Sequence, residues 1–312
     1  MAFTGTDQVW MNGSLVAWKD ATVHVAAHAL HYGTGIFEGI RAYETKHGSA
    51  VYRLPEHMRR LYDSCRVYRM EPPWAVDVLS TAVLETVRAN GYASCYIRPL
   101  VYRGVESLGL DPRPCPVEAS IIVWEWNAMF GAEGLEKGID VSVSSWNRLA
   151  PNTLPAMAKA SGNYANSALI KMQALIDGYG DAIALDESGL VSEGSGQNLF
   201  LVRDRVIYTP AINSSILQGI TRDSVLTIAR DLGYEVREAA IPREMLYLAD
   251  EAFFCGTAVE VTPVRSIDRI LVGDGTRGPV TAAIQRHFFG IIAGDIPDTH
   301  RWLTPVPATV AR

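Results

Sequence analysis

A short β-hairpin near the start of the sequence restricts the fold more than any other local pattern. Residues 8–11 and residues 14–18 flank the dipeptide Asn12-Gly13. Asn-Gly is well suited to the positive φ angles that a two-residue hairpin turn requires. We therefore expect an antiparallel sheet in the N-terminal part of the chain.

The length and composition indicate an ordinary globular protein. Its 312 residues can bury a large core and favour two domains. A hydrophobic fraction of 48% is typical of a globular protein. The net charge of −6 gives no indication of the broad basic surface that nucleic-acid binding needs. The first ten residues lack a secretory signal pattern, and no apolar run reaches membrane-spanning length. These features predict a soluble, cytoplasmic protein without membrane or nucleic-acid partners.

The four cysteines are Cys65, Cys95, Cys115 and Cys255. They are widely spaced and form no C-x-x-C pair, which argues against a structural zinc site and against a disulfide framework. We expect them to be mostly buried small hydrophobic residues in a reducing compartment. No metal site is predicted.

Strand and helix patterns alternate along the chain. Pro55 suits the first turn of a helix, and Gly91 suits the end of another. We expect this second helix, over residues 74–90, to bury Val76, Leu79, Val83 and Val87. Strands are expected over residues 51–54, 95–102, 121–126, 139–144, 182–185, 190–192 and 252–255, and a last helix over residues 280–292. Residues 127–138 are interpreted as the link between domain 1–126 and domain 139–312.

The helix that begins at Tyr164 has an expected apolar stripe. Its members are Ala165, Ala168, Leu169, Met172 and Ile176. Helical geometry then turns Lys171 well away from the centre of this stripe.

One lysine differs from the others. The chain has only five lysines, and Lys19, Lys46 and Lys137 lie in polar or turn-like surroundings. Lys159 lies among small residues, without an acidic neighbour. A desolvated lysine loses basicity and becomes a nucleophilic amine near neutral pH. On local sequence alone, a surface lysine on a small-residue loop is the more common case.

Several polar groups in the first half are candidates for binding. Tyr32 and Phe37 lie in a glycine-rich segment, where they either line a pocket or fill the core. One of the adjacent Arg59 and Arg60 is expected to face inward and to need an anionic partner. Tyr96 and Arg98 share one face of a strand, so Arg98 either helps to bind a carboxylate or pairs with a structural acid.

In the second half, Glu193 follows a strand and is flanked by glycine, which suits contact with a ligand as well as exposure to solvent. The stretch Gln218-Gly219-Ile220-Thr221 opens a helix whose free N–H groups and positive terminus suit a phosphate. Thr221 alternatively helps to cap this helix. Gly256-Thr257-Ala258 forms a small-residue turn whose amides suit a second anion.

Together these segments resemble the bacterial branched-chain amino-acid aminotransferases, which are class IV, fold-type IV pyridoxal-phosphate enzymes. The resemblance runs from about Trp10 to the last helix with order and spacing preserved. The matching motifs are Phe37-Glu38-Gly39-Ile40-Arg41, His57-x-x-Arg60-Leu61, Tyr96-Ile97-Arg98-Pro99, Ser144-Ser145-Trp146-Asn147-Arg148, Lys159-x-x-Gly162-Asn163-Tyr164, Glu193-Gly194-x-Gly196-x-Asn198, Gly219-Ile220-Thr221-Arg222 and Gly256-Thr257-Ala258.

The resemblance implies an α+β fold of two domains, a small N-terminal α/β sandwich and a larger C-terminal pseudo-barrel, with pyridoxal 5'-phosphate at the domain interface. Lys159 would be the catalytic residue that carries the cofactor and shuttles the proton. Glu193 would keep the pyridine nitrogen protonated, and Tyr164 would bond the phenolic oxygen. The implied cofactor-binding residues are Arg60, Lys159, Tyr164, Glu193, Leu217, Gly219, Ile220, Thr221, Gly256 and Thr257.

It also implies the substrates. The amino group of L-leucine, L-isoleucine or L-valine would pass reversibly to 2-oxoglutarate in a ping-pong cycle, and Arg98 would meet the distal carboxylate. The implied substrate-binding residues are Tyr32, Phe37, Gly39, Tyr96, Arg98, Trp126, Met129, Thr257 and Ala258. The functional assembly would be a homodimer or a larger homo-oligomer, in which residues 105–112 of one subunit reach the site of its partner.

Three other functions remain open at this point. A D-amino-acid or (R)-amine transaminase and an aminodeoxychorismate lyase share the same fold, although Tyr96 and Arg98 favour the L-branched-chain enzyme. A phosphate-ligand binding protein without chemistry would need neither Lys159 nor Glu193.

Overall fold

The computed structural model describes residues 5–126 and 129–308, and these form two compact units. The first unit contains the chain up to Trp126, the short segment Ala158–Gly162 and the end of the chain from Ile291. The second contains the residues up to Met157 that follow the first segment, together with Asn163–Gly290. The expected link of residues 127–138 includes residues 127 and 128, which lie outside the described residues, and a short helix, α4 (Gly131–Lys137).

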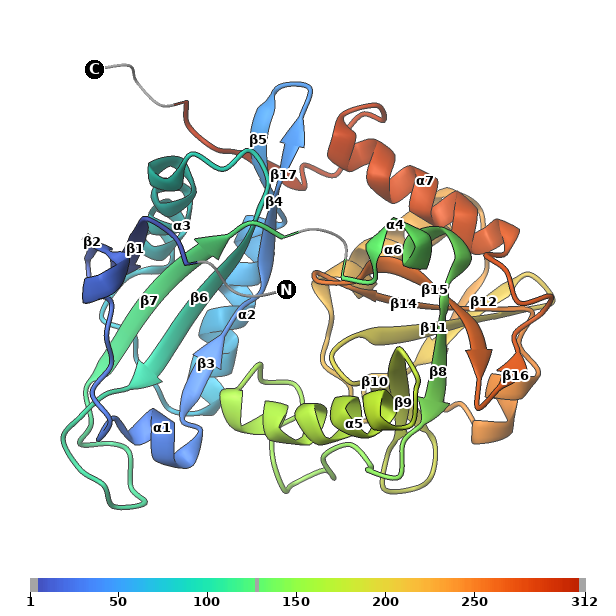
Figure 1. Cartoon of the computed structure of the whole chain (residues 1–312), viewed down its shortest axis with the longest axis horizontal. Helices are drawn as coiled ribbons and strands as arrows, with labels where there is room; N and C mark the ends of the chain where they lie inside the picture. Colours follow the sequence, from blue (N-terminus) through green and yellow to red (C-terminus); the bar gives the residue numbers. More distant parts are fainter. Residues whose placement is uncertain (1–4, 127–128, 309–312) are drawn as a thin grey trace. The chain divides into compact units, whose positions relative to one another are not determined.

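Eight strands of the described chain form the sheet of the first unit, in the order β17-β5-β4-β6-β7-β1-β2 with β3 also paired to β6 (Figure 1). Each of these neighbouring pairs is antiparallel. The strands are β1 (Gln8–Met11), β2 (Ser14–Ala17), β3 (Gly35–Phe37), β4 (Ile40–Thr45), β5 (Gly48–Tyr52), β6 (Cys95–Arg103), β7 (Val117–Trp124) and β17 (Leu303–Pro305).

The predicted N-terminal hairpin is confirmed. Strand β1 pairs with β2 in antiparallel register, and a 3-10 turn, η1 (Trp18–Asp20), follows directly. Asn12 and Gly13 have φ angles of 48° and 106°, so both turn residues occupy the left-handed region that this dipeptide tolerates.

Two helices pack against this sheet, α2 (Leu54–Val67) and α3 (Val76–Asn90) (Figure 1). Pro55 lies in the first turn of α2, and Gly91 ends α3 in the left-handed conformation, as predicted. Their buried side chains share one core with the sheet. The expectation for Val76 is wrong, because its side chain is 41% exposed at the start of α3 and Ala82 is buried in the same helix.

A short helix, α1 (His28–Tyr32), lies in the glycine-rich segment where no helix was expected. The sequence there shows too little periodicity because α1 has only five residues, and only His28 among them is buried. Gly33 ends this helix with a φ angle of 67°.

Nine strands of the described chain form the mixed sheet of the second unit, in the order β10-β9-β8-β15-β14-β11-β12-β13 with β16 paired to β15. Strand β8 runs parallel to both β9 and β15, and β12 runs parallel to β13. The strands are β8 (Ile139–Val143), β9 (Asp181–Leu185), β10 (Val191–Gly194), β11 (Asn198–Arg203), β12 (Val206–Pro210), β13 (Val236–Ala239), β14 (Glu251–Gly256), β15 (Glu260–Ile267) and β16 (Ile270–Leu271).

The helices of the second unit connect these strands. A 3-10 turn, η2 (Ser161–Asn163), leads into α5 (Tyr164–Ile176), which packs on β9 (Figure 1). Helix α6 (Ile220–Asp231) follows the segment after β12, and η3 (Arg243–Tyr247) precedes β14. Helix α7 (Pro279–Ala293) follows the second sheet and confirms the predicted last helix.

The predicted apolar stripe of α5 is wrong. Ala165 and Ala168 are exposed, and so are Leu169, Met172 and Ile176, at 37%, 52% and 84%. The helix instead buries Ser167, Ile170 and Ala174. This rotation turns Lys171 towards β9, where its Nζ lies 2.8 Å from the fully buried Asp181 carboxylate. The helix thus presents Lys171 to a buried acid, a contact that hydrophobic periodicity does not register.

The four cysteines are buried and free, as expected. Within the described part of the chain, every helix is too short or too polar to cross a bilayer.

Candidate active site

Backbone hydrogen bonds hold Lys159 in the first unit from both sides. Its N–H donates to Ser64 Oγ on α2 at 3.1 Å, and its carbonyl oxygen accepts from the Phe37 N–H at 3.0 Å. The next residue, Ala160, forms a bridge with Ile36. The side chain is half-buried, and Nζ lies 5.0 Å from the centroid of the Phe37 ring. The lysine is therefore fixed at its backbone and lies against an aromatic face.

A buried charge cluster lies on α2 and the end of β3. Glu38 is fully buried and accepts from Arg60 Nε at 2.6 Å, from Arg60 Nη2 at 2.8 Å and from His57 Nδ1 at 2.7 Å. Arg60 thus faces inward and has an anionic partner, as predicted. Burial alone would raise the pKa of the Glu38 carboxyl, but the Arg60 and His57 charges and hydrogen bonds outweigh it and hold the pKa well below its ordinary value.

Aromatic rings surround Arg98 on β6. Its guanidinium carbon lies 4.7 Å from the centroid of the Phe37 ring, 5.5 Å from that of Tyr96 and 5.6 Å from that of Trp124. This arrangement holds a cation beside apolar surface without requiring a buried carboxylate. Such surroundings suit contact with apolar groups as well as with an anion.

Other residues of the first unit shape the same neighbourhood. A Cβ atom on Gly39 would lie 2.0 Å from Tyr96 Oη, so only glycine fits there. Trp126 contacts Tyr96, with their ring centroids 5.3 Å apart. Tyr32 is 43% exposed, and its hydroxyl donates to the Leu108 carbonyl at 2.8 Å, which ties α1 to the loop after β6.

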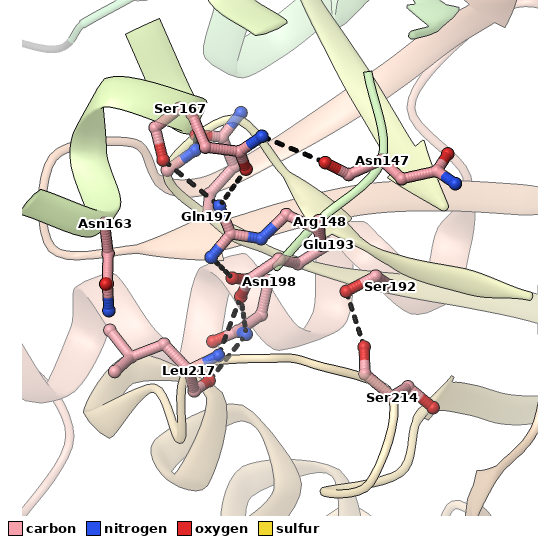
Figure 2. Close-up of polar contacts among 12 residues, drawn as sticks. Asn147, Arg148, Asn163, Ser167, Ser192, Glu193, Gln197, Asn198, Ser214 and Leu217 are labelled. Atoms are coloured by element: carbon pink, nitrogen blue, oxygen red, sulfur yellow. Dashed lines mark hydrogen bonds and ion pairs between the residues drawn. The ribbon is translucent and has the colours of Figure 1, made fainter. Parts of the chain in front are cut away.

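In the second unit, Glu193 lies at the centre of a polar network (Figure 2). Its carboxylate is buried, with Oε1 2.8 Å from Arg148 Nη2. Its Oε2 accepts from Asn198 Nδ2 at 3.0 Å and from the Leu217 N–H at 3.1 Å. The residue is therefore neither solvated nor part of an apolar core, and its carboxylate is oriented from several sides.

The same network reaches the start of α6. Asn198 Nδ2 also donates to the Leu217 carbonyl at 3.0 Å, and a Cβ atom on Gly219 would lie 1.9 Å from Asn198 Oδ1. Gly219 is the N-cap of α6, and no side chain hydrogen-bonds to this cap. Thr221 is buried in the first turn and is not the capping side chain. The first amides of a helix lack intrahelical acceptors, so this terminus suits an anion.

The remaining candidates of the second unit lie at the ends of regular elements. Tyr164 is the first residue of α5 and is half-buried. Gly256 ends β14, and Thr257 and Ala258 form the turn before β15. Met129 is 41% exposed just before α4.

The structure adds polar residues to which the sequence analysis assigned no role. Arg148, Glu38, His57 and Asn198 all lie in motifs that carry the resemblance, yet each was noted only as part of a pattern. Their signal in the sequence is charge or amide character in segments that are otherwise apolar or rich in small residues. Such groups are costly to bury without partners, which makes them candidates for paired sites.

Comparison with known proteins adds the family. The profile described as Amino-transferase class IV matches residues 35–267, a range that includes Glu38, Arg60, Lys159 and Glu193. The chain belongs to the class IV amino-transferase family, and it is accordingly an enzyme.

Particular relatives are similar over nearly the whole chain. A curated branched-chain-amino-acid aminotransferase of Salmonella typhimurium is 51% identical over 301 residues, which are 96% of this chain and 97% of the relative. The solved branched-chain amino acid aminotransferase of Escherichia coli has a TM-score of 0.95 at 50% identity and covers 97% of this chain and 100% of its own.

A third relative is the branched-chain amino acid aminotransferase from Thermobaculum terrenum, solved in its PLP-form (holo-form). It has a TM-score of 0.91 at 36% identity over 97% of this chain and 99% of its own. These likenesses confirm the predicted α+β fold of fold-type IV with two sheets.

Proposed function

We propose that this enzyme reversibly transfers the amino group of L-leucine, L-isoleucine or L-valine to 2-oxoglutarate, with pyridoxal 5'-phosphate as cofactor and L-glutamate as product. The relatives at about half identity carry the name of this activity. The observation that carries the dual substrate is Arg98, a cation lying over three aromatic rings. Apolar side chains suit the rings, and the distal carboxylate of glutamate suits the guanidinium.

The donor sets of both units fit pyridoxal 5'-phosphate. In the second unit, the start of α6, with Gly219, Ile220 and Thr221, suits the phosphate. In the first unit, Arg60 is oriented by Glu38 and also suits an anion. Glu193 is a buried carboxylate of the kind that a protonated ring nitrogen requires. Leu217, Gly256 and Thr257 complete the proposed cofactor contacts. When bound, the cofactor supplies an electron sink for the negative charge that develops at the substrate Cα.

The chain's own groups then perform the remaining tasks. Lys159 carries the cofactor and moves the proton at the substrate Cα, and its fixed backbone limits where Nζ can reach. Glu193 holds a proton on the ring nitrogen, and Tyr164 donates to the phenolic oxygen. Because the amino donor and the 2-oxo acid would use one site in turn, with the first product leaving before the second substrate binds, we expect ping-pong kinetics.

We propose that the substrate carboxylate binds to Tyr96 and to the Thr257 and Ala258 amides. The side chain would then lie among apolar and aromatic groups. These proposed wall residues are Tyr32, Phe37, Gly39, Trp126 and Met129. The van der Waals overlap that any Cβ at position 39 would make with Tyr96 supports a close fit at this point.

We also propose that the enzyme works in the cytoplasm as at least a homodimer. The loop of residues 105–112 supports this proposal, because Val105, Leu108 and Leu110 are 42%, 52% and 81% exposed. Apolar exposure of this kind is typical of an interaction surface. Sedimentation analysis of the wild-type enzyme and of Leu110→Asp tests it, with a smaller species expected for the variant.

An absorbance titration tests the proposed activity. The protein mixed with pyridoxal 5'-phosphate is expected to show a bound-cofactor band that L-leucine or L-isoleucine discharges. Lys159→Ala should lose both the band and turnover. Initial rates with D-alanine and (R)-1-phenylethylamine provide the comparison, and a preference for either of these donors would assign a sister activity instead.

A further inference from the structure

Arg148 lies in the loop between β8 and η2 and is held by three neighbouring elements. Its N–H donates to the Leu185 carbonyl at the end of β9 at 2.8 Å. Its Nη1 donates to Asn166 Oδ1 at 3.1 Å and to Ser167 Oγ at 3.3 Å, both on α5. Its Nη2 then lies 2.8 Å from Glu193 Oε1 on β10 (Figure 2). The guanidinium is thus oriented towards the carboxylate by contacts within the second unit.

The opposite side of the carboxylate is held by neutral donors. Asn198 Nδ2 and the Leu217 N–H both donate to Oε2. Both side chains of the Arg148–Glu193 pair are about 6% exposed. An isolated carboxylate at this depth would take up a proton, because burial penalises the charged form. Neutral hydrogen bonds reduce that penalty, and a hydrogen-bonded cation reduces it further.

Two other titratable groups of the second unit, Arg222 and Cys255, do not replace Arg148. Arg222 on α6 has its own acid, since Nη2 lies 2.9 Å from Glu238 Oε2. Cys255 on β14 is fully buried, and burial together with Glu193 raises the pKa of its thiol while Arg222 opposes the rise. The thiol therefore stays neutral and contributes no charge.

We propose that Arg148 is a positioning residue for the transamination: by pairing with Glu193 it keeps that carboxylate ionised and oriented to hold a proton on the cofactor's ring nitrogen. The proposal rests on the proposed function. Pairing lowers the proton affinity of Glu193. The carboxylate therefore stays ionised in the buried site, and a shared proton stays on the ring nitrogen.

Three substitutions separate charge from shape. Arg148→Met removes both the charge and the donors, Arg148→Gln keeps donors without charge, and Arg148→Lys keeps the charge. Lys171→Met is the matched control, because it also removes a cation from a fully buried carboxylate of the second unit, Asp181. A purely structural role predicts the same behaviour for Arg148→Met and Lys171→Met.

The first measurement uses the cofactor-free protein. With carbon-13-labelled glutamate, infrared spectroscopy at neutral pH distinguishes a protonated glutamic acid from an ionised one and from any aspartic acid. We expect a protonated-glutamic-acid band in Arg148→Met and Arg148→Gln that disappears when Glu193→Gln is added, and no such band in the wild-type protein or in Arg148→Lys. Absence of the band from both Arg148→Met and Arg148→Gln would overturn the proposal.

The second measurement uses the holoenzyme. We expect kcat to fall at least about tenfold in Arg148→Gln, with little change in KM for L-leucine. A factor of ten corresponds to a change of about one unit in the pKa of the Glu193 carboxyl. Arg148→Lys should recover part of kcat, and Lys171→Met should keep kcat while losing thermal stability. An equal kcat loss in Lys171→Met would also overturn the proposal.

The outcomes remain distinguishable from failure of the proposed function. A wild-type protein that binds no pyridoxal 5'-phosphate would refute the proposed activity. The infrared comparison does not need the cofactor, so it would still decide whether Arg148 maintains the charge of Glu193. If Arg148→Met does not fold, Arg148→Gln and Arg148→Lys carry the comparison, because both retain a hydrogen-bonding side chain.

Discussion

Arg60 and Glu38 form a two-pronged ion pair in the first unit, with Nε donating to Oε1 at 2.6 Å and Nη2 donating to Oε2 at 2.8 Å. Arg59, the preceding residue of the same helix, has a side chain that is 84% exposed and lies 3.8 Å from the exposed Asp63. Two adjacent arginines therefore make a buried ion pair and a solvent-screened one on a single helix. This contrast offers an internal control for the cost of breaking a buried pair.

Glu38→Gln should destabilise the protein by about 3 kcal/mol, because it leaves the Arg60 charge without its anion in a buried setting. Arg59→Ala should change stability by no more than about 0.5 kcal/mol, since exposed pairs contribute little. Urea unfolding of the cofactor-free protein followed by fluorescence measures both values. Similar costs for the two substitutions would contradict the interpretation of Glu38 as the buried partner of Arg60.

His57 predicts a loss of stability in mild acid. Burial lowers the pKa of His57 from its ordinary value of 6.5; Glu38 opposes this, and Arg60 and Lys159 add to the lowering. Below pH 6.5 the unfolded chain therefore binds a proton that the folded protein does not, and the free energy of unfolding falls by up to about 1.4 kcal/mol per pH unit. This fall continues until the pH reaches the lower pKa of the folded state.

His57→Asn keeps a donor near Glu38 but does not titrate. The free energy of unfolding of this variant should change less than that of the wild-type protein as the pH is lowered through 6.5. Glu38 contributes a separate loss at lower pH, because its folded-state pKa is also depressed and its stabilisation is lost as the pH falls below the unfolded value of 4.5. Denaturation curves at several pH values on either side of 6.5 make the comparison, and identical slopes for both proteins would refute the assignment.

Local rules predicted much of the fold and individual positions of the site. The Asn12-Gly13 turn, Pro55 at the start of α2 and the left-handed Gly91 all follow from the backbone preferences of single residues. The inward orientation of Arg60 also follows from local geometry, because adjacent residues on a helix differ by about 100°. Such predictions need no knowledge of distant residues.

Long-range pairing was not predictable in the same way. On α5, Lys171 pairs with Asp181, which follows the helix and lies on β9, and the expected stripe at Leu169 and Met172 is exposed. Likewise, nothing local to Arg148 identifies Glu193 as its partner across 45 positions of sequence. Hydrophobic periodicity identifies only apolar positions, whereas the Lys171–Asp181 and Arg148–Glu193 contacts join charged groups.

Gly219 should tolerate no larger residue. A Cβ atom there would lie 1.9 Å from Asn198 Oδ1, the side chain that also contacts Glu193 and Leu217. Gly219→Ala should therefore displace either Asn198 or the start of α6 and weaken cofactor binding by about tenfold, or about 1.4 kcal/mol. Titration with pyridoxal 5'-phosphate measures this change.

Gly196→Ala is the matched control for Gly219→Ala. Nothing lies within 4 Å of a Cβ atom at position 196, although this glycine belongs to the same unit and to the turn after Glu193. Its cofactor affinity should match that of the wild-type protein. Equal affinity in Gly219→Ala would mean that the contact with Asn198 does not position the helix terminus.

Arg98→Met should separate the two substrate classes. The guanidinium lies over the rings of Phe37, Tyr96 and Trp124, so methionine can occupy similar apolar space without the charge. Loss of a charge-assisted contact with the distal carboxylate should raise KM for 2-oxoglutarate by about 10- to 100-fold, which corresponds to roughly 1.5–3 kcal/mol. KM for L-leucine should change by less than about threefold, because a hydrocarbon side chain makes no ionic contact. Steady-state rates with each substrate varied in turn provide the measurement. A parallel rise in both KM values would assign Arg98 to the general shape of the first unit and not to recognition of the acid.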